Sequence, residues 1–343
     1  MLTIYSQDHQ HHHGQSEIVD GTIQPSFEMP RRVEMVLDRI KQTALGDIVE
    51  PADYGLAPVL RIHDARYVNF LEQAWPRWQA LNRCHDALPN AWPIRGLRSD
   101  RIPDDIDGQL GFYSFDMSTP ITAGTWPAIR AAANVALTGA EKLVQTGQAV
   151  FSLCRPPGHH AASDYMGGYC YFNNAAIAAQ ALRDQGARRV AILDVDYHHG
   201  NGTQSIFYRR NDVLFVSLHG DPRNEYPYYL GYADETGDDD GLGYNVNYPM
   251  PHGTDWDHYR LALEAACQKI RQFAPDALIV SLGVDTFEHD PISQFRLKND
   301  HYLRMGELIA ALEHPTLFVM EGGYAVEDIG INAVNVLAGF EQG

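Results

Sequence analysis

Asp194, Asp196 and His198 stand at alternate positions in the sequence, a spacing that can build a metal site. Alternate residues of a strand share a face, so the three side chains can point the same way, although a turn beyond the strand end would let only part of the set converge. An imidazole and a carboxylate two residues apart are suitable ligands for a divalent metal, and Asp285 can supply a third. Three protein ligands with one open position are typical of a catalytic metal.

Two adjacent histidines are candidates for the acid–base chemistry that such a metal needs. Two carboxylates and one imidazole nearly cancel the charge of a divalent ion, so bound water is acidified less than at an all-histidine site. His159 and His160 follow an Arg-Pro-Pro-Gly turn at residues 155–158. An aspartate partner favours imidazolium, whereas an asparagine partner leaves the pKa nearer its ordinary value of about 6.5. With Asp194 beside His159 and Asn201 beside His160, His160 is the better base and His159 the better electrostatic stabiliser.

Tyr324 is the candidate for stabilising a developing oxyanion. It follows Gly322 and Gly323, which free the backbone to bring the ring over the site. A phenol with a pKa of about 10 stays protonated at pH 7 and can donate a hydrogen bond to negative charge on a substrate oxygen. A metal, a base and an oxyanion donor together indicate an enzyme.

The elements that must position these residues are parallel strands. Short apolar runs predict strands buried on both faces, and helical patterns lie between them. This alternation predicts an α/β fold with a mostly parallel multi-stranded sheet and helices on both faces. Ligands bind beyond the carboxyl ends of such strands, so the polar loops after four of these runs should meet at one rim. The predicted strands are 149–154, 189–195, 213–218, 277–282 and 316–320, and the predicted helices are 173–185, 256–273 and 299–312.

The composition excludes several classes of protein. The chain has 343 residues, with Lys+Arg 26 against Asp+Glu 44 and a net charge of −18. This acidic balance argues against nucleic-acid binding, which depends on cations meeting phosphates, and is compatible with cationic ligands. No window approaches the roughly 18–20 apolar residues of a membrane helix, no signal peptide is visible, and four cysteines form no disulfide scaffold. We expect one cytoplasmic domain over residues 1–343, without membrane or nucleic-acid partners.

Two segments lie outside this α/β pattern. Residues 82–113 contain several prolines and glycines with weak periodicity, which predicts a long loop or insertion. Loops of this length in compact domains usually act as lids or interfaces, or are disordered. The histidine-rich run from His9 to His13 directly follows a strand-like start at residues 2–5 and predicts a native surface cluster rather than a tag.

With these residues the sequence resembles the arginase–deacetylase superfamily, and within it the zinc deacetylases. Matching motifs lie in order between about residues 155 and 324, namely RPPGHH, GGYCYFNN, LDVDYHHGNGT, SLHGD, SLGVDTFEHDP and MEGGY. The N-terminal segments SEIVDG, PSFEMPRR, RIHDARYVNFLE and RIPDDIDGQLGFY, and the HGDP segment, are similar to one branch, the bacterial acetylpolyamine amidohydrolases. The resemblance covers nearly the whole chain and implies the arginase–deacetylase fold, with the active site at the C-terminal ends of the strands.

The resemblance also implies roles for individual residues of the catalytic centre. It makes Asp196, His198 and Asp285 zinc ligands, and Tyr324 the oxyanion-stabilising tyrosine. The tandem catalytic histidines match His159 and His160. A potassium ion near the zinc is implied at Asp194 and Ser217, and a second potassium ion around Phe207, Arg210, Val213 and Tyr244.

Substrate contacts follow from the same resemblance. Tyr169 and Tyr226 match aromatic residues that flank the acyl channel, and Glu17 and Asp107 match in kind the acidic residues that meet a cationic amine. A third acidic position falls on Ser118, with Asp116 nearby, which departs from the pattern of the polyamine branch.

Two positions separate the branches of the superfamily. Asn201 stands where several histone deacetylases carry aspartate and acetylpolyamine amidohydrolases carry asparagine, which favours the polyamine branch. Gly200 stands where arginase needs a further aspartate for its second metal, which disfavours arginase.

The sequence therefore predicts a zinc-dependent amidohydrolase, or deacetylase, that removes acetyl groups from N-acetylated polyamines such as acetylputrescine, acetylcadaverine and acetylspermidine. The alternative is a deacetylase of lysine in peptides, or a broad hydrolase of small acyl amides. A site with two carboxylates and one imidazole can also hold Fe²⁺ or Co²⁺. We expect a homodimer in which residues 82–113 form a dimer contact and an active-site gate, and small cationic acetylated amines as substrates.

Overall fold

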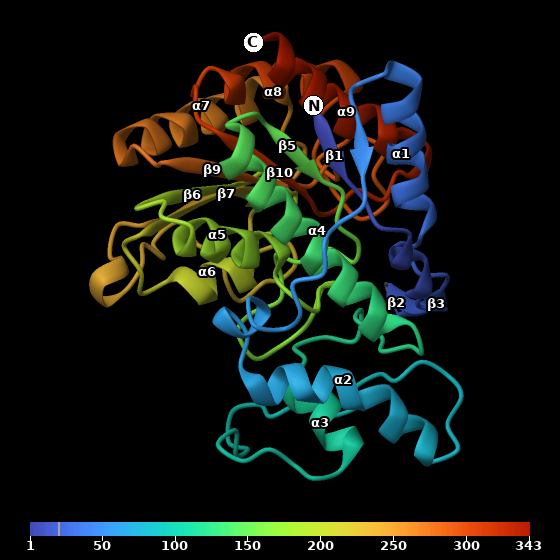
Figure 1. Cartoon of the computed structure of the whole chain (residues 1–343). Coiled ribbons are helices and arrows are strands. Elements are labelled where there is room, and N and C mark those ends of the chain that lie inside the picture. The colour runs from blue at the N-terminus through green and yellow to red at the C-terminus, as the bar shows by residue number, and fades with distance from the viewer. Residues whose placement is uncertain (20) are drawn as a thin grey trace.

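An eight-stranded parallel sheet lies at the centre of the computed structural model, which describes residues 1–19 and 21–343 (Figure 1). Its strand order is β4-β1-β5-β10-β9-β6-β7-β8, and every neighbouring pair is parallel. The strands are β1 (Leu2–Ile4), β4 (Ile48–Val49), β5 (Val150–Ser152), β6 (Val190–Asp194), β7 (Val213–Gly220), β8 (Asn245–Met250), β9 (Ala277–Leu282) and β10 (Thr316–Met320). The predicted parallel α/β sheet is confirmed.

The five predicted strands are the central ones, and the unpredicted strands lie at the edges. β9 and β10 have the predicted bounds, and every residue of both strands is buried. β4 and β8, which the sequence analysis did not identify, are the two edge strands. β4 is only two residues long, and β8 contains asparagines, a proline and partly exposed positions, so neither shows the continuous apolar run of a doubly covered strand.

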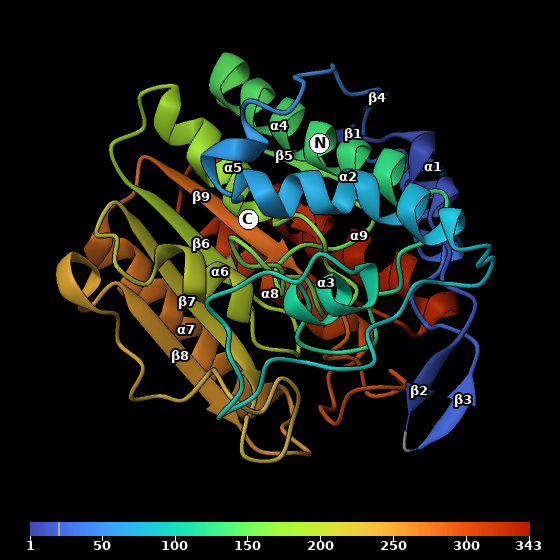
Figure 2. The same ribbon diagram turned by 90° about the horizontal axis from the view of Figure 1, so that it is seen from below.

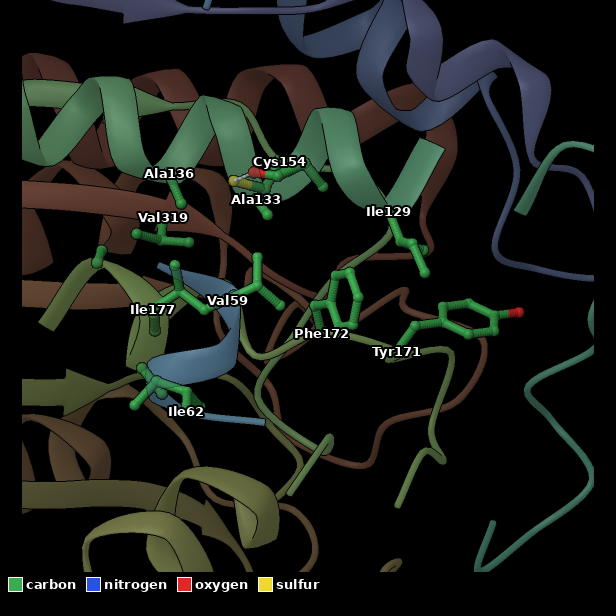
Figure 3. Packing of buried hydrophobic residues seen from close by; sticks show 14 of the residues in the cluster. Val59, Ile62, Ile129, Ala133, Ala136, Cys154, Tyr171, Phe172, Ile177 and Val319 are labelled. Carbon is green, nitrogen blue, oxygen red and sulfur yellow. Dashed lines mark hydrogen bonds between the residues drawn. The ribbon is translucent and has the colours of Figure 1, made fainter. Parts of the chain in front are cut away.

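Two layers of helices cover the two faces of the sheet (Figure 1). One hydrophobic cluster joins the sheet to four helices, α1 (Arg31–Thr43), α7 (Trp256–Phe273), α8 (Asn299–Ala310) and α9 (Val326–Gln342). The other cluster joins it to α2 (Ala65–Ala80), α4 (Thr125–Thr146) and α5 (Asn174–Asp184). In Figure 3, Ala133 and Ala136 of α4 and Ile177 of α5 pack near Val319 of β10.

Smaller elements complete the rim of the molecule. A two-stranded antiparallel hairpin, β2 (Glu17–Val19) with β3 (Thr22–Gln24), projects at one side in Figure 2. The short helix α6 (Asn201–Phe207) follows β6, and three 3₁₀ helices occupy Gln7–His11, Val59–Arg61 and Asp239–Gly241. Among the described residues, no helix combines the length and the apolar character needed to span a bilayer.

The histidine-rich run near the N-terminus is only partly a surface cluster. His9 and His12 are buried, whereas His11 and His13 are exposed. The 3₁₀ helix over Gln7–His11 turns His9 and His12 inward. There the His12 Nδ1 lies 3.0 Å from the Thr125 hydroxyl. The expectation of a surface cluster is therefore wrong for these two residues, because a short helical turn separates neighbouring side chains onto different faces.

The predicted loop at 82–113 contains a helix near its end. α3 (Ile106–Phe112) is capped by Asp105, whose carboxylate accepts a hydrogen bond from the Asp107 backbone N–H. Ile106 and Leu110, four residues apart, are buried on one face of α3. The glycines within this segment obscured the helical pattern. α2 and α3 lie together, apart from the sheet, at the bottom of Figure 1.

Candidate active site

Loops from four central strands bring the candidate residues together. His159 and His160 follow β5, Asp196 and His198 follow β6, Asp285 follows β9, and Tyr324 follows β10. All six residues are less than a tenth exposed. The convergence expected at the carboxyl ends of the strands is therefore present.

Asp196, His198 and Asp285 form a buried triad whose ligand-competent atoms all lie within 4.8 Å of one another. The His198 Nδ1 is 3.0 Å from Asp285 Oδ2 and 3.5 Å from Asp196 Oδ1. The second oxygens are held by backbone N–H donors: Tyr197 donates to Asp285 Oδ1 at 2.7 Å and Gly322 donates to Asp196 Oδ2 at 2.8 Å. Each carboxylate is thus oriented by the protein and faces the imidazole with its other oxygen.

The chemistry of this triad fits a divalent cation. Burial, and then the neighbouring charge of Asp196, raise the pKa of Asp285 to about 8, because two carboxylates this close repel each other when both are ionised. A bound cation would remove that penalty and keep both carboxylates charged. The backbone also leaves room, since a Cβ on Gly283 would lie 2.0 Å from Asp196 Oδ2.

The tandem histidines have the two different partners expected from the sequence. The His159 Nδ1 is 3.0 Å from Asp194 Oδ2, and the His160 Nδ1 is 2.6 Å from Asn201 Oδ1. Burial by itself lowers the pKa of His159, yet Asp196 and Asp194 raise it to about 10. Burial and the like charge of His159 hold the pKa of His160 well below its ordinary range. The two environments therefore favour the charged form of His159 and the neutral form of His160.

Glu321 holds the histidine loop in place, a role that the sequence analysis did not identify. Its Oε2 accepts hydrogen bonds from the backbone N–H groups of Gly158 at 2.7 Å and His159 at 3.1 Å. Because Glu321 directly follows β10, the loops after β5 and β10 are joined at this point. Its place next to the Gly-Gly-Tyr segment was the only signal that could have suggested it.

Asp290 and Arg32 hold the tyrosine loop and were also missed. Asp290 Oδ2 accepts from the backbone N–H groups of Tyr324 at 2.7 Å and Ala325 at 3.2 Å. The Arg32 guanidinium carbon lies 4.6 Å from the centre of the Tyr324 ring. Burial raises the pKa of Tyr324 well above its ordinary value, so its hydroxyl is a donor at neutral pH.

A cavity of about 350 Å³ leads to this group of residues. Its lining contains His160, His198 and Tyr324, and of the predicted substrate contacts it contains Tyr169, Tyr226 and Glu17. Both tyrosines of the cavity wall are hydrogen-bonded to carboxylates. The Tyr169 hydroxyl donates to Glu17 at 2.8 Å, and the Tyr226 hydroxyl donates to Asp116 at 2.6 Å.

Asp116 has a larger part in this wall than its sequence position suggested. Besides Tyr226, its Oδ2 accepts from the Gly168 N–H at 2.8 Å and from the Ser118 hydroxyl at 2.7 Å. Asp116 and Ser118 both line the cavity. A carboxylate is therefore present in the wall even though Ser118 replaces the expected acidic residue.

Asp107 does not lie with the other predicted substrate contacts. Asp107 lies on α3, and its two carboxylate oxygens accept from Arg83 Nη1 at 2.6 Å and Nη2 at 2.9 Å. Asp107 is absent from the described lining of the cavity. Within a single chain Asp107 therefore does not reach the cavity, and its contact with substrate stays a prediction.

The residues matched to the two potassium sites lie near opposite ends of β7. Asp194 and Ser217 are paired neighbours on β6 and β7, and both are fully buried. The Asp194 Oδ1 accepts from the Asp196 N–H at 3.2 Å, and the Ser217 hydroxyl is 2.8 Å from His219 Nδ1. The second set lies around the start of β7, where the Arg210 backbone N–H donates to the Phe207 carbonyl at 2.9 Å.

The chain is similar to known proteins along nearly its whole length. Residues 26–340 match the histone deacetylase domain family. The chain is 64% identical to acetylpolyamine amidohydrolase 2 and 62% identical to acetylpolyamine amidohydrolase 1 of Pseudomonas aeruginosa, with 99% of both chains covered in each case. The crystal structure of an acetylpolyamine aminohydrolase from Burkholderia pseudomallei has a TM-score of 0.94 and 42% identity, covering 99% of this chain and 98% of that one.

We predict that Asp285→Ala and His198→Ala each prevent stoichiometric metal binding, because two ligands cannot replace a buried set of three. Metal content after loading with zinc and dialysis is the measurement. Asp107→Ala is the matched control, since it removes a carboxylate outside the triad and should retain the metal. Full zinc occupancy in both triad variants would remove these residues from the ligand set.

Proposed function

The chain belongs to the histone deacetylase domain family and is a deacetylase, and within that family we propose that it hydrolyses N-acetylated polyamines to acetate and the free amine. The observation that carries the proposal is the acidic, aromatic wall of the cavity above the triad. The names of the Pseudomonas relatives support the same substrate class.

The charges along the cavity suit a slim cation. Glu17, Asp116 and Glu225 line it, and its described lining includes no lysine or arginine. Carboxylates on a low-dielectric wall attract an alkylammonium group and raise its local concentration. Tyr169 and Tyr226 offer ring faces to the methylene chain and to the charge, an arrangement that also favours cationic ligands. A slender polyamine could therefore enter with its acetyl group leading.

The catalytic residues have distinct tasks in this proposal. A divalent metal held by Asp196, His198 and Asp285 would polarise the acetyl carbonyl and activate water. His160, neutral and aimed into the cavity, accepts the proton of the attacking water. The Tyr324 hydroxyl donates a hydrogen bond to the oxyanion of the tetrahedral intermediate and keeps its proton. A histidine then protonates the leaving amine.

The proposed resident metal is Zn²⁺, with Fe²⁺ or Co²⁺ as ions that the same ligands accept. K⁺ is proposed for the site at Asp194 and Ser217, where it would compensate the buried Asp194 carboxylate. Both assignments extend the resemblance to the zinc deacetylases.

Residues 82–113 are proposed to form a homodimer contact and to narrow access to the cavity. Ile94 and Leu97 support this proposal, because their side chains are 67% and 63% exposed. Exposed apolar side chains close together in one segment are typical of an interaction surface. Within a single chain Asp107 is paired with Arg83, so a contact between Asp107 and substrate would require the dimer.

We predict that the chain has a higher kcat/KM on acetylputrescine, acetylcadaverine or acetylspermidine than on an acetyl-lysine peptide.

Ile94→Asp combined with Leu97→Asp should weaken the dimer and raise relative activity on the peptide, because two charges oppose burial of this surface. Sedimentation and paired assays measure both effects. Leu261→Asp, at a position 58% exposed on α7, is the control. Preference of the wild type for peptides would instead favour a lysine deacetylase.

We predict that Tyr324→Phe retains fold and metal and lowers kcat by about 10²–10³, the usual effect of losing one oxyanion donor. The loss should appear in kcat more than in KM, because the hydrogen bond is strongest in the transition state. The acidic limb of the pH profile, set by the base, should be unchanged. If the variant keeps more than about a third of wild-type kcat, a loss well under 1.4 kcal/mol, Tyr324 is a packing residue.

A further inference from the structure

A buried carboxylate outside the catalytic set lies between two arginines. Glu28 is 2% exposed, and its Oε1 accepts from Arg32 Nη1 at 3.0 Å and from Arg155 Nε at 2.7 Å. Its Oε2 accepts from Arg155 Nη2 at 2.9 Å. Burial alone would raise the pKa of Glu28, but the two guanidinium groups lower it, so the carboxylate is ionised.

Arg32 connects this carboxylate to the tyrosine loop. Its Nε donates to the Gly323 carbonyl at 2.6 Å and its Nη2 donates to the Glu321 carbonyl at 2.6 Å. These carbonyls belong to the residues on either side of Gly322, immediately before Tyr324. The planar guanidinium can hold both carbonyls only while it keeps one orientation, and Glu28 occupies its remaining nitrogen.

Arg155 connects the same carboxylate to the histidine loop. It lies at the start of the segment that leads to His159, and its Nη1 and Nη2 donate to the carbonyls of His9 and His12 at 2.5 and 2.8 Å. Glu28 is therefore the shared anchor of two arginines, Arg32 of α1, which holds the tyrosine loop, and Arg155 of the histidine loop.

Removing the charge of Glu28 would leave two buried guanidinium groups without their common counterion. Breaking a buried ion network from one side is costly because the remaining charges are neither paired nor hydrated. Arg32 would then be drawn away from the Gly323 and Glu321 carbonyls, and the backbone before Tyr324 would lose its fixed position.

We infer that Glu28 is a positioning residue for Tyr324, which acts by fixing Arg32 against the backbone of the tyrosine loop. The inference rests on the deacetylation step of the proposed function and not on the polyamine. Glu28 does not line the described part of the cavity, so it affects the reaction only through other residues.

The test is a double-mutant cycle with Glu28→Gln and Tyr324→Phe, assayed on acetylputrescine and on a fluorogenic acetyl-lysine amide. Glu28→Gln should lower kcat at least about tenfold with little change in KM, and in the Tyr324→Phe background it should lower kcat less than about twofold. Glu327→Gln is the matched control, because it removes an exposed Arg–Glu pair at Arg31 and should leave kcat unchanged.

An equal loss of kcat in both backgrounds would overturn the inference, because Glu28 would then support the fold or the histidine loop in general. A shift of the acidic limb of the pH profile would also overturn it, since that limb belongs to the base. If Glu28→Gln does not fold, Glu28→Asp replaces it, because it keeps the charge but is too short to reach both arginines, and the same split is expected. Turnover of only the acetyl-lysine amide would contradict the proposed substrate while the cycle still decides the role of Glu28.

Discussion

The site depends on the central parallel strands ending at the same level of the sheet. Leu282 of β9 pairs with Met320 of β10, and Asp194 of β6 pairs with Ser281 of β9, so the three strands end within a residue of one another. A slip of one residue in any pair would turn its side chains to the opposite face of the sheet. In the observed register of β6 and β9, Asp196 and Asp285 lie beside each other beyond the strand ends.

Compensation of buried charge explains the rest of the architecture around that rim. Asp194 has His159, and Glu28 has two arginines, so these carboxylates find their partners within the chain. Asp196 and Asp285 share His198, and a second ring near them, that of His159, lies 3.8 Å from Asp196 and is paired more closely with Asp194. Three buried carboxylates therefore share two imidazoles, which leaves an excess of negative charge in a dry site. A divalent cation bound between these carboxylates would compensate the excess negative charge.

The sequence predicted those parts that leave a local pattern. β9, β10 and α7 have the predicted bounds because their apolar residues follow a regular pattern along the chain. β8, at the sheet edge, has no such pattern. The partners of His159 and His160 could be predicted because aspartate and asparagine affect the pKa of a neighbouring imidazole differently. The contacts of Glu28 with Arg155 and of Asp290 with the Tyr324 backbone could not be predicted, because these partners lie far away in the sequence. The pairing of Asp107 with Arg83 could not be predicted either, because residue type alone does not identify the partner of a carboxylate.

The central claim is that the strand ends assemble one catalytic metal site. Anomalous X-ray scattering at the zinc edge, measured on crystals of the zinc-loaded chain, tests it most directly. The account predicts a single strong peak bounded by Asp196, His198 Nδ1 and Asp285, with one coordination position open to the cavity. A peak elsewhere, or one closed by a fourth protein ligand, would contradict it.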